Sequence, residues 1–234
     1  MIHGIRLPLF LTLFGAFAAG APLRAADLLY VMLGTHNRVA SYDVSLGTSA
    51  AIAASGTTLA STNITGANGL AFDSSHQLYV ANIPINTISK FNSAGTYQSN
   101  ITGNLSSPVG LVFDSSGNLY AANYGNNTIS KFSSTGTYLS NITTNLNLPS
   151  GLAFDSSGNL YAANAGSNTI SKFNSAGTYL SSITTNLSNP RGLAFDSSGN
   201  LYASNVGDGT ISKFNSAGNF VFKWNTGSGP YLMA

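Results

Sequence analysis

Short apolar segments alternate with polar, turn-forming clusters over most of this 234-residue chain. One stretch contains four such segments of strand length, and they span Gly151–Phe154, Leu160–Asn164, Thr169–Phe173 and Thr178–Ile183. The clusters between them read Asp-Ser-Ser-Gly, Gly-Ser-Asn and Asn-Ser-Ala-Gly, and each composition is typical of a hairpin turn. The pattern therefore predicts four hairpin-linked strands in succession.

This four-strand unit recurs along the chain. Its opening Gly-Leu pair returns every 41 residues, at Gly69, Gly110, Gly151 and Gly192. Four hairpin-linked strands in a repeat of about 40 residues are typical of one β-propeller blade, whereas a parallel β-solenoid repeats at roughly half that length. We therefore expect an all-β propeller.

The two ends of the repeat region predict the number of blades. The Leu-Tyr pair of the second segment occurs five times, at Tyr30, Tyr79, Tyr120, Tyr161 and Tyr202, whereas the Gly-Leu segment occurs in full only four times. The first unit thus starts at its second strand, and Pro230–Ala234 stands where its missing first strand would fall. We expect about five four-stranded blades, closed into a ring by this C-terminal strand. The alternative of six blades needs a further unit within Asp43–Asn68, which is too short to hold one.

The repeat resembles a known family. The units approximate the pattern Pro-x-Gly-Leu-Ala-Phe-Asp-x-x-Gly-Asn-Leu-Tyr-x-x-Asn, followed by Asn-Thr-Ile-x-x-Phe, which is similar to the NHL repeat of six-bladed and related propellers. The resemblance implies one propeller domain over residues 27–234. It implies no single function, because NHL-like propellers include sensor domains, RNA-binding platforms, peptide-amidating lyases and extracellular binding modules. Similar sheets also form gluconolactonase-like enzymes and streptogramin lyases.

The first 26 residues have the features of a secretory signal peptide. Arg6 precedes an apolar run of fifteen residues, Leu7–Ala21, and Ala25 and Ala26 follow shortly before Asp27. Fifteen residues fall short of the roughly 20 that a transmembrane helix needs. We therefore expect cleavage between Ala21 and Asp27, a mature chain without a membrane span, and a secreted, periplasmic or cell-surface location.

Composition and charge narrow the function classes. Charged residues make up 7% of the chain, and Cys is absent, which excludes a thiolate metal site and a Cys nucleophile. Without residues 1–26, five Lys and two Arg face seven Asp, so the net charge is zero. Nucleic-acid binding relies on basic patches that contact phosphates, and we expect no nucleic-acid partner. We also expect a monomer that needs no cofactor.

The sequence contains few residues that could act as a catalytic acid or base. His36 and His76 are the only histidines after residue 26, so the three-His zinc site of the amidating lyases cannot form. The resemblance to gluconolactonase-like enzymes and streptogramin lyases implies sites that use Glu, which this chain lacks. Each first hairpin loop contains one Asp, which favours turn stabilisation over calcium binding. His76 fills a loop position that is Gly in other units, which predicts a positive φ. We predict no catalytic and no metal-binding residues.

Two sets of residues are candidates for ligand binding at the central channel. The first is a ring of amides at the ends of the second strands, which either binds a polar ligand or caps neighbouring loops: Asn82, Asn123, Asn164 and Asn205. The second set consists of the single-copy residues Tyr124, Arg191 and Asp208, which either converge on a ligand or reflect drift in solvated loops. The repeated tyrosines of the fourth strand are expected to pack between blades, at Tyr97, Tyr138 and Tyr179.

These observations favour an exported, non-catalytic propeller that acts as a binding or scaffold module. Its ligand is expected to be a protein, a polysaccharide or a small polar molecule. The alternative is an extracellular hydrolase or lyase of the gluconolactonase-like or streptogramin-lyase-like propeller type.

Overall fold

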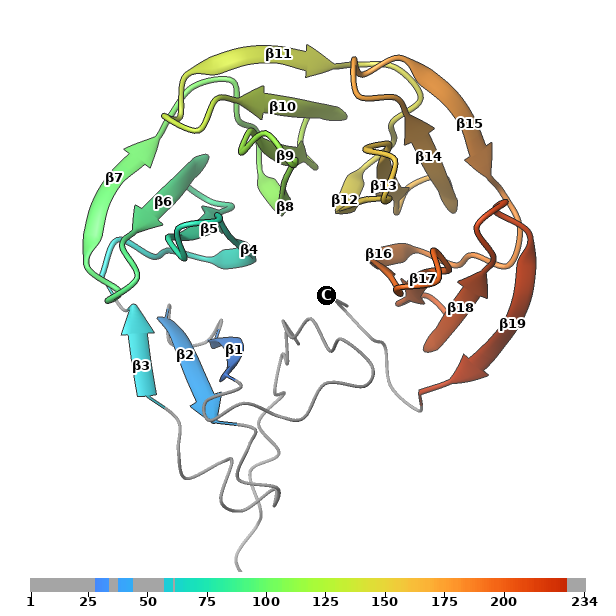
Figure 1. Ribbon diagram of the computed structural model, residues 1–234, viewed down its shortest axis with the longest axis horizontal. Helices are drawn as coiled ribbons and strands as arrows, with labels where there is room; N and C mark the ends of the chain where they lie inside the picture. The colour runs from blue at the N-terminus through green and yellow to red at the C-terminus, as the bar shows by residue number, and fades with distance from the viewer. Residues whose placement is uncertain (1–27, 34–37, 44–56, 61, 227–234) are drawn as a thin grey trace, which may run out of the picture.

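Four antiparallel sheets of four strands each are arranged around a common centre (Figure 1). The computed structural model describes residues 28–33, 38–43, 57–60 and 62–226. The regular secondary structure in these ranges consists of β-strands. We call the four sheets blades 1 to 4. Within each blade the strands follow one another in sequence order from the centre outward, which is the arrangement of a propeller.

The strand bounds follow the 41-residue repeat. Blade 1 consists of β4 (Ala67–Phe72), β5 (Leu78–Asn82), β6 (Thr87–Phe91) and β7 (Tyr97–Ile101). Blade 2 consists of β8 (Pro108–Phe113), β9 (Leu119–Asn123), β10 (Thr128–Phe132) and β11 (Tyr138–Ile142). Blade 3 consists of β12 (Pro149–Phe154), β13 (Leu160–Asn164), β14 (Thr169–Phe173) and β15 (Tyr179–Ile183). Blade 4 consists of β16 (Pro190–Phe195), β17 (Leu201–Asn205), β18 (Thr210–Phe214) and β19 (Phe220–Asn225).

The predicted hairpins are present, and their polar residues build the turns. In blade 2, Asp114 accepts hydrogen bonds at Oδ1 from the backbone N–H groups of Ser116 (3.0 Å) and Asn118 (2.8 Å). Gly117 follows with a φ of 79°. His76, at the equivalent position of blade 1, has a φ of 58°, as its replacement of Gly predicts. The Asp residues are therefore turn stabilisers, and the turns fix the register of the strands that they join.

Apolar side chains pack both within and between the blades. The Phe that ends each third strand is fully buried, at Phe91, Phe132, Phe173 and Phe214. Between blades, a Tyr of the second strand meets a Phe of the next innermost strand edge to face, with ring centroids 4.9 Å apart for Tyr79 and Phe113. The innermost strands β8 and β12 run so close together that a Cβ on Gly110 would overlap the carbonyl oxygen of Ser150. The repeated Gly is thus required by the approach of neighbouring blades.

The tyrosines of the fourth strands do not pack as the sequence predicted. Tyr97, Tyr138 and Tyr179 each meet a Phe of their own blade, with centroids about 6 Å apart, instead of lying between blades. They begin the outermost strands, which lie on the periphery of the molecule (Figure 1). The prediction was wrong because sequence periodicity does not distinguish an outer strand face from an interface between blades.

A fifth sheet, which we call the N-terminal sheet, has three strands. It consists of β1 (Leu28–Leu33), β2 (Arg38–Asp43) and β3 (Thr57–Ala60), and β1 approaches β4 of blade 1. The described residues thus form four complete blades, where the sequence predicted about five. Within the described residues, the N-terminal sheet has no fourth strand. The strand expected at Pro230–Ala234 lies outside the described residues, as does the segment expected to be cleaved.

No helix in the described part of the chain has the length and apolar character needed to cross a membrane.

Candidate functional site

Each propeller face has its own set of loops. One face, which we call the connection rim, carries the loops between second and third strands (83–86, 124–127, 165–168 and 206–209) and the segments that connect blades (102–107, 143–148 and 184–189). Backbone hydrogen bonds join the two kinds of segment, as between the Tyr124 N–H and the Ser107 carbonyl (3.2 Å). The opposite face, the hairpin rim, carries the remaining turns of each blade. Antiparallel topology places all the candidate ligand-binding residues at the connection rim.

The four repeated Asn side chains are buried and hydrogen-bonded within the protein. In each blade, the amide oxygen accepts a backbone N–H of the connecting segment at 2.9 to 3.2 Å. The amide nitrogen donates to a Thr and a Ser hydroxyl of the third strand at 2.8 to 3.1 Å. Exposure of the four side chains does not exceed 1%. They therefore have a structural role, and their hydrogen-bonding groups are not directed at a ligand: Asn82, Asn123, Asn164 and Asn205.

Two of the single-copy residues are in contact. The guanidinium carbon of Arg191 lies 5.0 Å from the centroid of the Tyr124 ring, and Nη2 donates to the phenol oxygen at 3.4 Å. Nε donates to Oδ1 of Asn189 at 3.0 Å, which fixes the orientation of the guanidinium. Both side chains are half-buried. Convergence was one of the two interpretations that the sequence allowed, and the structure brings these two residues together although they are 67 residues apart.

The Tyr124–Arg191 pair joins an innermost strand of one blade to the end of a second strand of another. Arg191 is the second residue of β16 in blade 4, and Tyr124 directly follows β9 in blade 2. The contact therefore reaches past blade 3, and the Ser150 hydroxyl of that blade donates to the Arg191 carbonyl at 3.2 Å. Among the described residues, no carboxylate forms an ion pair with Arg191. The pair thus presents an oriented cation beside an aromatic ring at the connection rim.

Asp208 lies apart from this pair. It accepts hydrogen bonds from Thr210 (2.6 Å) and from the ammonium of Lys223 (2.9 Å), which belongs to the outermost strand β19. Burial raises the pKa of the Asp208 carboxyl, but the bonds from Thr210 and Lys223 outweigh this effect and lower it. No hydrogen bond or ion pair joins Asp208 to the Tyr124–Arg191 pair within the described ranges. Its ion pair points to a role in attaching the outermost strand of blade 4.

The hairpin rim holds a repeated charged cluster that sequence reasoning missed. In blade 2, the Lys131 ammonium lies 3.7 Å from Asp114 and 5.0 Å from the centroid of the Tyr120 ring. Burial lowers the pKa of Lys131, but Tyr120 and Asp114 outweigh it and raise the pKa. Blades 3 and 4 repeat this arrangement. The recurrence of one Asp, one Tyr and one Lys per 41 residues was the available signal.

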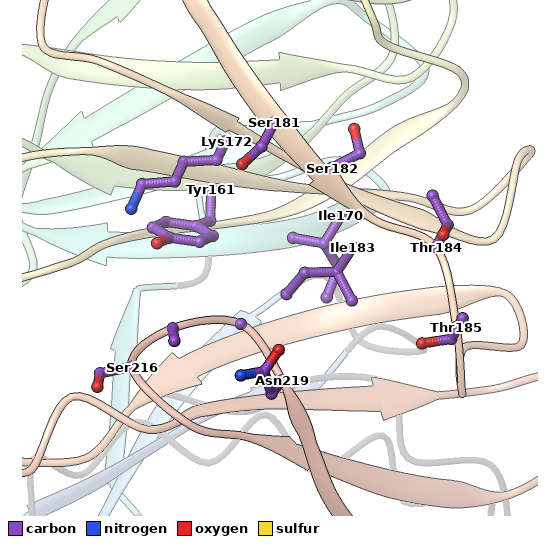
Figure 2. A pocket seen from close by; sticks show the side chains of 12 residues that line it. Tyr161, Ile170, Lys172, Ser181, Ser182, Ile183, Thr184, Thr185, Ser216 and Asn219 are labelled. Carbon is purple, nitrogen blue, oxygen red and sulfur yellow. The ribbon is translucent and has the colours of Figure 1, made fainter.

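A cleft of about 350 Å³ opens between blades 3 and 4 (Figure 2). Its walls come from β14 and β15 on one side and from the β18–β19 turn on the other. Hydroxyl and amide side chains dominate the lining, and Tyr161 and Lys172 lie at one end. The sequence signal for it was weak, because only Ser182 and Asn219 differ from the residues that the preceding repeat has at these positions.

Within the part of the chain that the structure describes, no three His, Cys, Asp or Glu side chains are grouped so that they could hold a metal ion. The described residues present two polar features, the oriented guanidinium at the connection rim and the cleft between blades 3 and 4.

The fold defines a β-propeller protein with radially arranged four-stranded blades. Within this class, residues 105–132 match the family model of the NHL repeat, so the chain contains an NHL repeat, as the sequence pattern indicated. No curated protein matches the chain.

Solved structures share the fold at low sequence identity. Virginiamycin B lyase from Staphylococcus aureus is similar with a TM-score of 0.71 at 13% identity, over 90% of this chain and 71% of that one. A chain of the nidogen/laminin complex is similar with a TM-score of 0.73 at 21% identity, over 86% of this chain and 76% of that one. A gluconolactonase from Xanthomonas campestris is similar with a TM-score of 0.72 at 18% identity, over 89% of this chain and 75% of that one. These similarities show a shared propeller fold, which hosts enzymes as well as a protein–protein complex.

Proposed function

We infer that this chain is an exported, non-catalytic NHL-repeat propeller that binds a protein, a polysaccharide or a small polar ligand at its connection rim. The observation that carries this inference is the Tyr124–Arg191 pair. A guanidinium stacked on an aromatic ring presents planar, multiple N–H donors in a fixed orientation, which suits carboxylates and hydroxyl groups.

The rigidity of the surroundings supports recognition. Arg191 is held by Asn189 and lies on β16, and Tyr124 directly follows β9, so both side chains are positioned by strands that are buried in the ring. A rigid scaffold that holds loop residues in place reduces the entropy that binding would otherwise cost. The half-burial of both residues means that a ligand would contact them in a partly desolvated environment, where hydrogen bonds to a charged group are stronger.

The proposal includes the mature form of the protein. Residues 1–26 act as a signal peptide, and Pro230–Ala234 supplies the innermost strand of the N-terminal sheet, which makes a fifth blade and closes the ring. The support for export is the apolar run Leu7–Ala21 after Arg6. N-terminal sequencing of the secreted protein tests it: the first residue should lie between positions 22 and 27, and a chain that starts at Met1 would contradict export.

The test of ligand binding starts from a screen of the mature protein against carboxylated and neutral polysaccharides, peptides and small polar metabolites. For the tightest-binding hit, Arg191→Ala and Tyr124→Ala should each weaken binding by roughly tenfold, because the first removes the oriented cation and the second releases it from the aromatic ring. Arg191→Lys should rescue little, since an ammonium lacks the planar fork. Lys131→Ala, on the opposite rim, is the matched control and should bind like the parent.

Measuring binding in the presence of a chelator separates this proposal from the hydrolase or lyase alternative. That alternative is of interest because a lyase and a gluconolactonase share the fold. Binding should persist in EDTA. Turnover of a screened compound that EDTA abolishes, with both variants behaving like the parent, would contradict the binding function and favour a metal-dependent enzyme.

A further inference from the structure

The cleft between blades 3 and 4 is a second candidate site, and it is independent of the Tyr124–Arg191 pair (Figure 2). None of its lining residues belongs to that pair. Its volume of about 350 Å³ is at the small end of the range for ligand sites, roughly 300 to 1,000 Å³. The cleft therefore suits a compact ligand.

The interface between blades 3 and 4 is looser than the two preceding interfaces. A Cβ built on Gly218 would lie 3.6 Å from the nearest atoms of Ile183, whereas the equivalent distance is 3.1 Å at both Gly136 and Gly177. Ile183 is also partly exposed, whereas the corresponding Ile101 and Ile142 are buried. The cleft is thus a local departure from the closer packing at the two preceding interfaces.

Polar groups of the lining have unused hydrogen-bonding capacity. Within the described ranges, five lining side chains are exposed to solvent and form no hydrogen bond to the protein: Ser181, Thr184, Thr185, Ser216 and Asn219. Each hydroxyl both donates and accepts, and the amide of Asn219 adds two donors and an acceptor. Figure 2 shows this amide directed into the cleft, opposite Ile183. Such a lining matches a ligand that is itself rich in hydroxyl groups.

The remaining lining argues for a neutral ligand with an apolar face. Ile183 lies over the fully buried Ile170 and gives the cleft an apolar floor. Lys172 supplies the cleft's one cation among the described lining residues, but its ammonium already lies 3.5 Å from Asp155 and 5.0 Å from the centroid of the Tyr161 ring. Because that charge is compensated, an anion gains little here.

We propose that this cleft binds a neutral saccharide unit of one or two rings. The C–H face of the sugar packs on Ile183, and its hydroxyl groups exchange hydrogen bonds with Asn219 and the Ser and Thr side chains around it. The proposal concerns a different site from the connection rim, so either one can fail without the other.

The experiment measures binding of D-glucose, D-galactose and N-acetyl-D-glucosamine, and of their β-1,4-linked disaccharides, to the mature chain by saturation-transfer NMR and titration. At least one of these should bind the parent. Asn219→Ala should weaken that binding roughly tenfold, because it removes the group aimed into the cleft. Ser181→Phe should abolish it by filling the cleft. Phe222 occupies the corresponding position of β19, so the strand accommodates this side chain.

The repeat supplies matched controls. Thr178→Ala and Ser140→Phe change the equivalent positions one repeat earlier, at the tighter interface, and should bind the sugar like the parent, as should Lys131→Ala. Thermal melts of all variants check folding, and Asn219→Ala carries the test alone if Ser181→Phe does not fold.

Four results would overturn the proposal. These are binding of none of the sugars, unchanged affinity in Asn219→Ala, displacement of the sugar by inorganic phosphate, and loss of sugar binding in Arg191→Ala, which would place the sugar at the connection rim.

Discussion

Single residues in this chain differ sharply in what they contribute, even when they are of the same type. Asn123 is fully buried, and its side chain accepts from the Ser106 N–H and donates to Thr128 and Ser130. Asn141 is exposed on the outermost strand of the same blade. Two Asn residues of one repeat thus have unlike roles, because burial decides whether an amide must be satisfied by the protein or by water.

We predict that Asn123→Ala lowers the free energy of unfolding by about 2 kcal/mol, since it removes the acceptor of the partly buried Ser106 N–H and the donor to the Thr128 and Ser130 hydroxyls. Urea titration followed by circular dichroism measures the change. Asn141→Ala is the control and should stay within about 0.5 kcal/mol of the parent. Equal effects of the two substitutions would show that the buried network is not what stabilises the connecting segment.

At the scale of the element, the first and second strands of each blade are joined by a turn that contains an Asp. Nearby donors form hydrogen bonds to its carboxylate. In blade 4, the Asp196 carboxylate accepts from the Asn200 side chain (2.8 Å), from the backbone N–H groups of Asn200 and Ser198, and from Tyr202. These bonds, led by that of the Asn200 side chain, lower the pKa of Asp196 to about 2. The turn is therefore built for the charged carboxylate.

A pH dependence follows from this pKa. Because the folded protein holds the Asp196 pKa below its ordinary value of 3.8, the turn contributes stability above about pH 4 and loses it as the pH falls toward 2. In an NMR titration, the Asp196 carboxyl should titrate with a midpoint near 2, and Asn200→Ala should move the midpoint upward. A midpoint at the ordinary value in the parent would contradict the hydrogen-bonded turn. Asn141→Ala should leave it unchanged.

At the scale of the whole molecule, blades are joined through their innermost strands and through edge-to-face Tyr–Phe contacts. Each blade therefore depends on its neighbours, and the two ends of the blade series are its most vulnerable points. The N-terminal sheet has no innermost strand among the described residues, so its inner edge is where closure of the ring is decided.

We predict that deleting Pro230–Ala234 from the mature chain lowers its melting temperature by about 5 °C or more and promotes aggregation, because an unpaired strand edge is exposed. Differential scanning calorimetry and light scattering measure both effects. A variant in which these residues are replaced by a Gly/Ser segment of the same length separates the strand from mere chain length, and it should behave like the deletion. An unchanged melting temperature would show that the ring is open or closed in another way.

The sequence by itself determined the repeat, the strands and their turns, because these depend on local patterns. The alternation of apolar and polar positions defined Leu160–Asn164 and Thr169–Phe173 to the residue, and Gly at the turn positions predicted the positive φ of His76. The innermost strand was predicted less well: it begins at Pro149, two residues before the recurring Gly. Local preferences are sufficient for such features since neighbouring residues in the chain make the relevant contacts.

Only the tertiary structure decided which candidate residues face one another. From the sequence, the Asn series could either bind a polar ligand or cap neighbouring loops, and the packing of the connecting segments buries it in the second role. Arg191 and Tyr124 meet across 67 residues, whereas Asp208, three residues beyond Asn205, pairs with Lys223 on the outermost strand. The width of the cleft beside Ile183 also depends on how two blades pack. Such contacts join residues that are distant in sequence, so the geometry of the whole ring sets them.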